Sequence, residues 1–322
     1  MSNLADRPVI ALAIGDPAGI SPELTARVVA LPEIKQVAKV VVIGDRRVFE
    51  QGARVAGLAG DPEVFIDLAN LDPASVQQGV ASREGGASAL ANYRRALSMV
   101  GTGEAQAVCF TPFNKQAMRL AHASYDDEIR FTASEIGFSG TATEFNILEG
   151  LWNARVTSHI PLKDVSAALT SDGIVEALEL TAAALSAAGF RPPRIGVAAL
   201  NPHAGDGGNF GRDEIDVIGP AVERAKAAGL PVDGPYPADT VFVRAKAGQF
   251  DAVLTMYHDQ GQIAMKLLGF DRGVTLLGGF PFPICTPAHG TAYDIAGRGL
   301  ANVGAARAAL LLAASMARTV TR

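Results

Sequence analysis

The chain has little of what disulfide-stabilised, membrane-spanning and nucleic-acid-binding proteins need. It has only two cysteines in 322 residues, Cys109 and Cys285, so neither a disulfide framework nor a cysteine-based zinc site is expected. No apolar run is long enough to span a bilayer, and residues 1–7 lack the basic and apolar regions of a signal peptide, so we expect a cytoplasmic protein. A net charge of −5 without a long basic run argues against nucleic acid or an anionic membrane as a partner.

Short apolar runs alternate with helical segments along the chain, which predicts an α/β fold with a largely parallel sheet. The length of 322 residues suits two lobes with a cleft between them. No biased linker separates the lobes, so we expect a shared sheet and a chain that passes between the lobes more than once. Ser21 is expected to cap the first helix, with Pro22 at the first helical position. The predicted strands are 8–14, 40–43, 107–110, 195–200, 252–256 and 274–277, and the predicted helices are 87–100, 213–228 and one from 305.

Three of the five histidines, His159, His203 and His258, each stand where an apolar run gives way to a polar turn. Strand ends of this kind display the functional side chains of α/β proteins. A lone histidine there is most often structural, but three neutral imidazoles together predict a divalent-metal site with open positions for a substrate. Asp259 and Gln260, next to His258, are candidate hydrogen-bond partners of the ligating imidazoles.

The glycine-rich segment 205–211 lies between a predicted strand and a predicted helix, as a dinucleotide-binding loop does. Its spacing does not fit that motif, because Phe210 occupies the third glycine position. We therefore interpret it as a loop that shapes the surroundings of His203.

The segment 289–302, His-Gly-Thr-Ala-Tyr-Asp-Ile-Ala-Gly-Arg-Gly-Leu-Ala-Asn, is more specific. It resembles the adenosine-binding segment of isocitrate and isopropylmalate dehydrogenases. Glycine permits close backbone approach, histidine can face a purine, and aspartate can cap the next turn or accept a hydrogen bond from the nucleoside. The alternative is an ordinary glycine-punctuated loop. The candidate cofactor-binding residues are His289, Gly290, Thr291, Ala292 and Asp294.

Together these motifs resemble the 4-hydroxythreonine-4-phosphate dehydrogenase family of vitamin B6 synthesis. The resemblance runs from end to end and is carried by 15–20 (Gly-Asp-Pro-Ala-Gly-Ile), the His159 turn, 201–205 (Asn-Pro-His-Ala-Gly), 238–240 (Ala-Asp-Thr), 256–261 (Met-Tyr-His-Asp-Gln-Gly) and the His289 segment. It implies a two-lobed α/β fold of the isopropylmalate dehydrogenase type, with residues 1–135 and about 290–322 in one lobe. The other lobe, 136–289, would carry the metal ligands and the contacts of a homodimer.

The resemblance further implies that His159, His203 and His258, drawn from both subunits, hold zinc, magnesium or cobalt. The family reaction oxidises a secondary alcohol beside a carboxylated carbon, passes hydride to NAD or NADP, and releases carbon dioxide from the resulting β-keto acid. A metal held by neutral imidazoles suits this chemistry because it keeps its positive charge. Lys266 matches a substrate-binding lysine of the family that pairs with the substrate carboxylate or relays a proton, and its apolar neighbours make a solvated surface lysine a less favoured alternative. Lys266 and Asp259 are thus the candidate catalytic residues.

The substrate pocket departs from the family pattern. Glu128 and Ile129 stand where a histidine and a threonine contact the substrate, and Thr275 and Ile284 replace an asparagine and an arginine. Glu128 adds a carboxylate and Ile284 removes a cation, and both changes disfavour the binding of a phosphate group. Arg130 can compensate from a shifted position. We therefore expect a substrate without phosphate, for example a cis-dihydrodiol carboxylate such as terephthalate dihydrodiol.

Three alternatives remain open at this stage. The first is the 4-hydroxythreonine-4-phosphate dehydrogenase of pyridoxal phosphate biosynthesis with an unusual pocket. The second is a zinc hydrolase, for which three histidines and an activated water suffice. The third is a non-enzymatic binding module, which requires the three histidines to stay apart in the fold.

Overall fold

The computed structural model describes residues 7–320, and the chain divides into two compact units. Unit 1 ends at Ala142 and resumes at Asp271, whereas unit 2 is Thr143–Phe270. The chain therefore passes between the units twice. The segment 271–289, expected in the second lobe, belongs to unit 1, where its second strand pairs in parallel with a strand of the amino-terminal half. Residues 1–6, on which the expected lack of a signal peptide largely rests, lie outside the described part.

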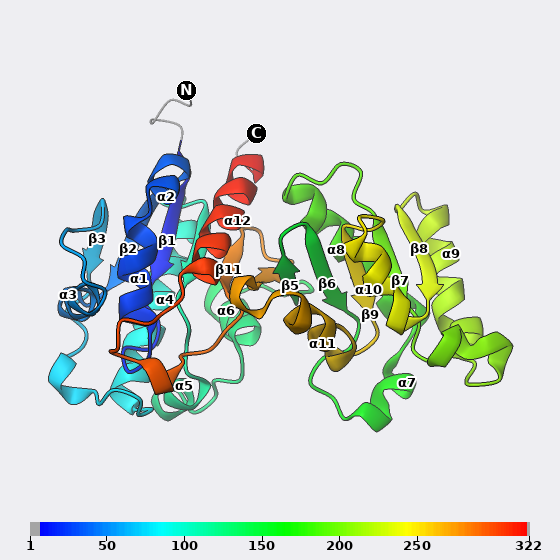
Figure 1. Cartoon of the computed structure of the whole chain (residues 1–322), viewed down its shortest axis with the longest axis horizontal. Coiled ribbons are helices and arrows are strands. Elements are labelled where there is room, and N and C mark those ends of the chain that lie inside the picture. Colours follow the sequence, from blue (N-terminus) through cyan, green and yellow to red (C-terminus); the bar gives the residue numbers. More distant parts are fainter. Residues whose placement is uncertain (1–6, 321–322) are drawn as a thin grey trace. The chain divides into compact units, whose positions relative to one another are not determined.

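Unit 1 is a mostly parallel sheet between two groups of helices (Figure 1). Its strand order is β3-β2-β1-β4-β11-β10, and only β10 and β11 pair antiparallel. Helix α1 contacts α2, α3 and α12, while α4 contacts α5 and α6. The strands are β1 (Val9–Ala13), β2 (Lys39–Gly44), β3 (Val64–Asp67), β4 (Ala107–Phe110), β10 (Val274–Gly278) and β11 (Ile284–Pro287). The helices are α1 (Ser21–Ala30), α2 (Pro32–Val37), α3 (Arg46–Val55), α4 (Arg83–Gly101), α5 (Lys115–Ala121), α6 (Glu128–Ile136) and α12 (Gly304–Val320).

The central strands of unit 1 are buried on both faces, which explains why they read as continuous apolar runs. An aromatic cluster fills the core under α4, where the ring of Tyr93 packs against Phe110, Phe113 and Phe131. The expected cap of α1 is wrong. Ile20 occupies the N-cap position, and the hydroxyl of Ser21 donates instead to the carbonyl of Pro112, 2.8 Å away.

Unit 2 has the strand order β5-β6-β9-β7-β8, in which only β5 and β6 pair antiparallel. Helix α11 packs on β5, β6 and β9, and helix α10 packs on β7 and β9. The predicted helix 213–228 begins with a π turn, Glu214–Ile218, before α9. The strands are β5 (Thr143–Leu148), β6 (Leu151–Arg155), β7 (Ile195–Ala198), β8 (Val232–Tyr236) and β9 (Ala252–Thr255). The helices are α7 (Val165–Ala168), α8 (Ser171–Ala187), α9 (Gly219–Ala227), α10 (Ala238–Lys246) and α11 (His258–Gly269).

The predicted α/β class and the largely parallel sheet are confirmed, and all six predicted strands are present within a few residues of their expected ends. Strands β3, β5, β6, β8 and β11 were not predicted. The cleft between the lobes and the sheet shared by them stay predictions. Between residues 7 and 320, no helix is long and apolar enough to cross a bilayer.

Candidate active site

His159 and His258 come together at the carboxyl ends of two adjacent parallel strands of unit 2. His159 lies in the turn after β6, and His258 is the first residue of α11, just after β9. Because β6 and β9 pair with Arg155 opposite Thr255, their ends point in the same direction. The centroids of the two imidazole rings are 5.5 Å apart, and the ring planes are tilted by 43°. Two of the three predicted metal ligands are therefore neighbours in a single chain.

Backbone hydrogen bonds continue past the strand ends and fix the two histidine turns side by side. The amide of Thr157 donates to the carbonyl of Met256 over 3.1 Å, and the hydroxyl of the same threonine donates to the same carbonyl over 2.8 Å. His159 itself has φ = 55°, in the left-handed region that is unfavourable for a residue with a Cβ. Such strain persists only where neighbouring contacts hold it, and it is common at functional sites.

The two polar neighbours of His258 have different roles. The Asp259 carboxylate lies 2.7 Å from the His258 Nδ1, as expected for a group that orients a metal-binding imidazole. Gln260 does not contact a ring. Its side chain accepts a hydrogen bond from the Met256 amide and donates to the Ala199 carbonyl, both at 2.7 Å. The expected imidazole partner is therefore Asp259 alone, and Gln260 instead ties the start of α11 to the end of β7.

His203 does not join the histidine pair within the chain. It is exposed in the turn after β7, and its ring centroid lies 6.1 Å from that of Phe210. No group of three or more His, Cys, Asp and Glu side chains placed to hold a metal occurs among residues 7–320. The turn is left-handed from His203 to Gly207, with φ between 44° and 78°.

Glu214 supports the base of the His203 turn. One oxygen of this buried carboxylate accepts the backbone amides of Leu200 and Asn201, at 2.9 and 2.8 Å. The other oxygen accepts from the Asn201 side chain at 3.0 Å, and Asp213 accepts from the same side chain at 2.8 Å. Glu214 was not predicted as a site residue. It lies in a segment predicted to be helical, between Asp213 and Ile215, so the local sequence does not distinguish it from a surface acid.

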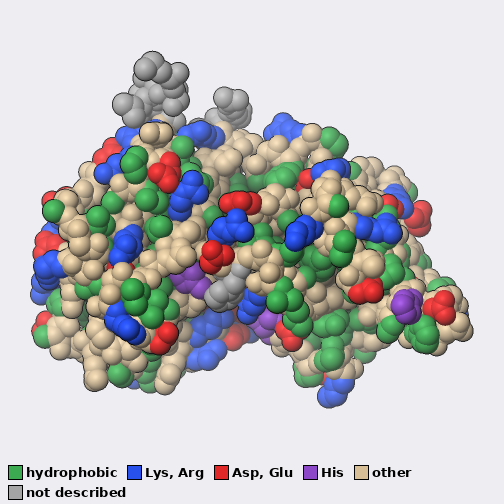
Figure 2. All heavy atoms as spheres, viewed as in Figure 1, with side chains coloured by type: hydrophobic (Ala, Val, Ile, Leu, Met, Phe, Trp, Pro, Cys, Tyr) green, Lys and Arg blue, Asp and Glu red, His purple; other side chains and the backbone are tan. Residues whose placement is uncertain are grey.

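Lys266 is exposed on α11, the helix that begins with His258. The expectation that its apolar neighbours would shield it is wrong, because the helix is amphipathic. Met265 faces the core, whereas Ile263 and Leu267 are 61% and 84% exposed. Figure 2 shows apolar side chains at the surface among charged ones on the viewed face.

The predicted cofactor segment lies in unit 1, after β11. Gly290 is exposed, and a Cβ at this position would meet nothing within 4 Å, so a ligand has room to approach the backbone. The His289 Nδ1 lies 3.0 Å from the carbonyl of Gly290. Asp294 is exposed within a short 3₁₀ turn, and Ala292 before it has a left-handed backbone with φ = 44°.

Two contacts of the predicted cofactor segment are not evident from the sequence. The hydroxyl of Tyr293 donates a hydrogen bond to the carboxylate of Asp16, and the amide of Ile20 donates to the carbonyl of Thr291 at 3.0 Å. Asp16 is buried, and burial raises the pKa of its carboxyl above the ordinary value. The loop 15–19 was singled out in the sequence for its resemblance to a family motif, but nothing local to it indicates a contact with Tyr293, 277 positions away.

The predicted substrate residues of unit 1 divide into two groups. Glu128 begins α6, and one of its carboxylate oxygens lies 3.6 Å from the Lys115 Nζ. Ile129 packs against the aromatic core, while Arg130 is 76% exposed and pairs with Asp126. Arg130 therefore has an acidic partner of its own.

The other two predicted substrate residues lie in adjacent strands of the sheet. Thr275 is half-buried in β10, and Ile284 is fully buried in β11 as part of the core. A fully buried isoleucine offers no surface to a substrate in this conformation. Ile284, which stands where the family pattern has an arginine, is therefore part of the hydrophobic core.

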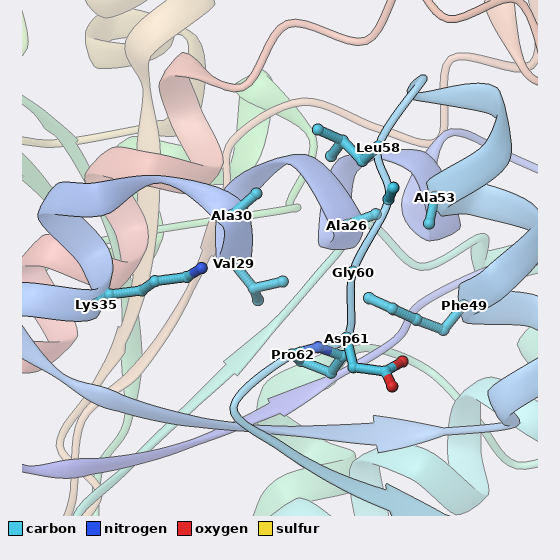
Figure 3. Close-up of a pocket in the computed structure, with 11 residues that line it drawn as sticks. Ala26, Val29, Ala30, Lys35, Phe49, Ala53, Leu58, Gly60, Asp61 and Pro62 are labelled. Carbon is cyan, nitrogen blue, oxygen red and sulfur yellow. The ribbon is translucent and has the colours of Figure 1, made fainter.

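A separate hollow lies in unit 1 between α1, α3 and the loop 57–62 (Figure 3). Its volume is about 70 Å³, well below the several hundred cubic ångströms of sites that bury a cofactor. Its lining is mostly apolar, with Lys35 and Asp61 as the charged side chains, and it includes none of the predicted site residues. We therefore do not place the dinucleotide there.

Comparison with known proteins gives the family. The model of the family described as pyridoxal phosphate biosynthetic protein PdxA matches residues 36–313. A relative from Rhizobium meliloti, named putative 4-hydroxythreonine-4-phosphate dehydrogenase 2, is 60% identical over 97% of this chain and 94% of its own length.

Solved structures agree. The 4-hydroxythreonine-4-phosphate dehydrogenase of Klebsiella pneumoniae is 33% identical, with a TM-score of 0.83 over 97% of this chain and 99% of that one. A terephthalate 1,2-cis-dihydrodiol dehydrogenase from Burkholderia xenovorans is 29% identical, with a TM-score of 0.68 over 96% of this chain and 98% of that one. The chain belongs to the PdxA family.

Proposed function

We propose that this chain is a dehydrogenase that oxidises the secondary alcohol of a small phosphorylated hydroxy acid, with 4-hydroxythreonine 4-phosphate as its substrate. Hydride passes to NAD or NADP, and the resulting β-keto acid loses carbon dioxide. The observation that carries the proposal is the pairing of His159 and His258 at the ends of β6 and β9, in a chain whose relatives are named as dehydrogenases.

The paired imidazoles fit a divalent metal. Their ring centroids are 5.5 Å apart, close enough for one nitrogen of each ring to reach a single ion at ordinary bond lengths of about 2.0–2.1 Å. Asp259, bonded to the Nδ1 of His258, leaves the Nε2 of that ring for the metal. A bound metal would chelate the substrate hydroxyl and carboxylate and favour loss of hydride. Lys266, exposed on the same helix as His258, pairs with the substrate carboxylate or accepts the hydroxyl proton.

His203 completes this site from a second copy of the chain. In its own chain it is exposed and apart from the pair. Large apolar side chains next to the histidine turns are also exposed, as expected for a surface that another subunit covers. They are Ile160 and Leu162 after His159, and Phe210 and Ile215 after His203.

The phosphorylated substrate replaces the dihydrodiol carboxylate that we expected from the sequence. The relative named for the phosphorylated compound is 60% identical, whereas the one named for terephthalate dihydrodiol is 29% identical. The structure also weakens the argument from charge. Lys115 stands beside Glu128 and supplies a cation there, and Ile284 is part of the core.

A direct test follows the absorbance of reduced nicotinamide with metal-loaded protein, using 4-phosphohydroxythreonine and a cis-dihydrodiol carboxylate in parallel. We expect turnover of the phosphorylated compound and its loss on chelation. The variant H258A should lose turnover, whereas H122A, which changes a histidine bonded to Ser124, should keep it. Turnover of the dihydrodiol alone would overturn the substrate, and a protein that does not bind NAD or NADP would leave the zinc hydrolase as the better account.

A further inference from the structure

We propose that Asp16 and Tyr293 form a latch that holds residues 291–293 in the conformation that binds the nicotinamide dinucleotide. The two residues are thus positioning residues for the cofactor. This inference rests on the proposed function, because it takes the segment 289–302 as the cofactor-binding segment. The segment contacts the loop that joins β1 to α1.

The inner side of the segment is fixed by two closely spaced hydrogen bonds. The amide of Ile20 donates to the carbonyl of Thr291 over 3.0 Å, and the hydroxyl of Tyr293 donates to the carboxylate of Asp16. The approach is tight, since a Cβ on Gly19 would lie 2.6 Å from the Thr291 oxygen. The loop and the segment therefore fit together only with glycine at this position.

The Asp16 side chain is buried and held in place by hydrogen bonds. Its side chain is 1% exposed, and its other oxygen accepts the amide of Ala18 over 2.9 Å. Both carboxylate oxygens therefore have partners, which fixes the direction in which the acid faces Tyr293. Loss of the tyrosine hydroxyl would leave one oxygen of a buried acid without its partner, a costly arrangement.

The latch spans a strained residue. Ala292 lies between the two anchored residues and has φ = 44° and ψ = 58°. A residue with a Cβ avoids this left-handed region unless its surroundings impose it. The anchors at Thr291 and Tyr293 are what impose it here. Without them the backbone of Ala292 would relax, and the neighbouring residues would change direction.

The outer side of the segment is open where the inner side is fixed. Gly290 and Asp294 are exposed on either side of the latched residues. The downstream end has separate anchors, because Glu23 accepts the amide of Ala301 over 3.0 Å and Arg27 donates to the carbonyl of Gly299 over 2.7 Å. Loss of the latch should therefore loosen the middle of the segment and leave its end in place.

The test is the variant Y293F, which removes one hydroxyl and no carbon. We expect the Kd and KM for NAD to rise about three- to tenfold, the loss typical of one hydrogen bond, with kcat nearly unchanged. The matched control is Y236F, which removes a tyrosine hydroxyl that donates to Asp233 in unit 2. Y236F should bind NAD as the wild type does.

A second variant separates the latch from a general loss of structure. In A292G the left-handed backbone carries little penalty, so Y293F should weaken NAD binding less in that background than in the wild type. Equal effects in both backgrounds would overturn the role of Ala292. Saturable NAD binding by the wild type that is unchanged in Y293F would overturn the latch alone, whereas a wild type that binds neither NAD nor NADP would overturn the proposed function with it.

Discussion

Removal of the Glu214 carboxylate should destabilise unit 2 and release the His203 turn. The variant E214A leaves the backbone amides of Leu200 and Asn201 without the acceptor that each now has at 2.9 or 2.8 Å. A buried donor without a partner costs about 1–3 kcal/mol, so two of them predict a loss of about 2–6 kcal/mol in the free energy of unfolding. The more conservative E214Q keeps an acceptor oxygen, and we expect it to lose less.

The assay is urea denaturation monitored by circular dichroism, with chelator-sensitive turnover measured beside it. E223A serves as the matched control, because Glu223 is 72% exposed and pairs only at the surface with Lys226. This control should unfold at nearly the wild-type midpoint. If E214A also unfolded at the wild-type midpoint and kept its metal-dependent turnover, the carboxylate would not be what holds the turn.

Two further predictions concern unit 1. The pKa of the buried Asp45 is lowered, mainly by its hydrogen bonds from Arg47. This carboxyl therefore stabilises the fold above its ordinary pKa of 3.8, and the stabilisation is lost as the pH falls through the lower pKa of the folded state. We expect D45N to be less stable than the wild type at neutral pH and the unfolding free energies of the two proteins to converge in acid. In α4, a Cβ on Gly86 would lie 2.0 Å from the carbonyl of Ala117, so G86A should lower the midpoint of thermal unfolding. The control G101A should not, because a Cβ at Gly101 meets nothing within 4 Å. Equal midpoints for the two variants would show that α4 and α5 can move apart freely.

The strands that could be predicted from the sequence are those that are mostly buried and also almost wholly apolar. Strands β1, β2, β4 and β9 are apolar throughout or nearly so, and burial on both faces produces that pattern. The missed strands carry polar residues or proline. β8 contains Asp-Gly-Pro, which typically marks a turn, and β5 contains glutamate and asparagine. Their strand conformation comes from pairing with a neighbour, which local sequence does not report.

The candidate site was predictable to the extent that it rests on strand ends. The pairing of β6 with β9 brings His159 and His258 together, although β6 itself was not predicted. The position of His203 depends on contacts that cannot be inferred from local spacing. Asp16 was part of a motif noted for its resemblance to a family, but its contact with Tyr293 joins residues 277 positions apart, so only the fold could reveal it.

Left-handed backbone occurs in three segments that the sequence pointed to separately, namely the His159 turn, the His203 turn and the predicted cofactor segment. Among the described residues, the non-glycine positions with positive φ are Ala69, His159, His203, Ala204, Asp206 and Ala292. All but Ala69 lie in the two exposed histidine turns or in the cofactor segment. At Ala204 and Ala292 the residue type gives no signal of a left-handed backbone, since alanine adopts it only when its surroundings impose it. In each case a specific support is present: the hydrogen bonds from Thr157 to Met256, just after β9, for the first turn, Glu214 for the second, and the Asp16 latch for the third. These supports hold the backbone in conformations that direct the side chains proposed to bind the metal and the cofactor, so we expect their loss to reduce binding.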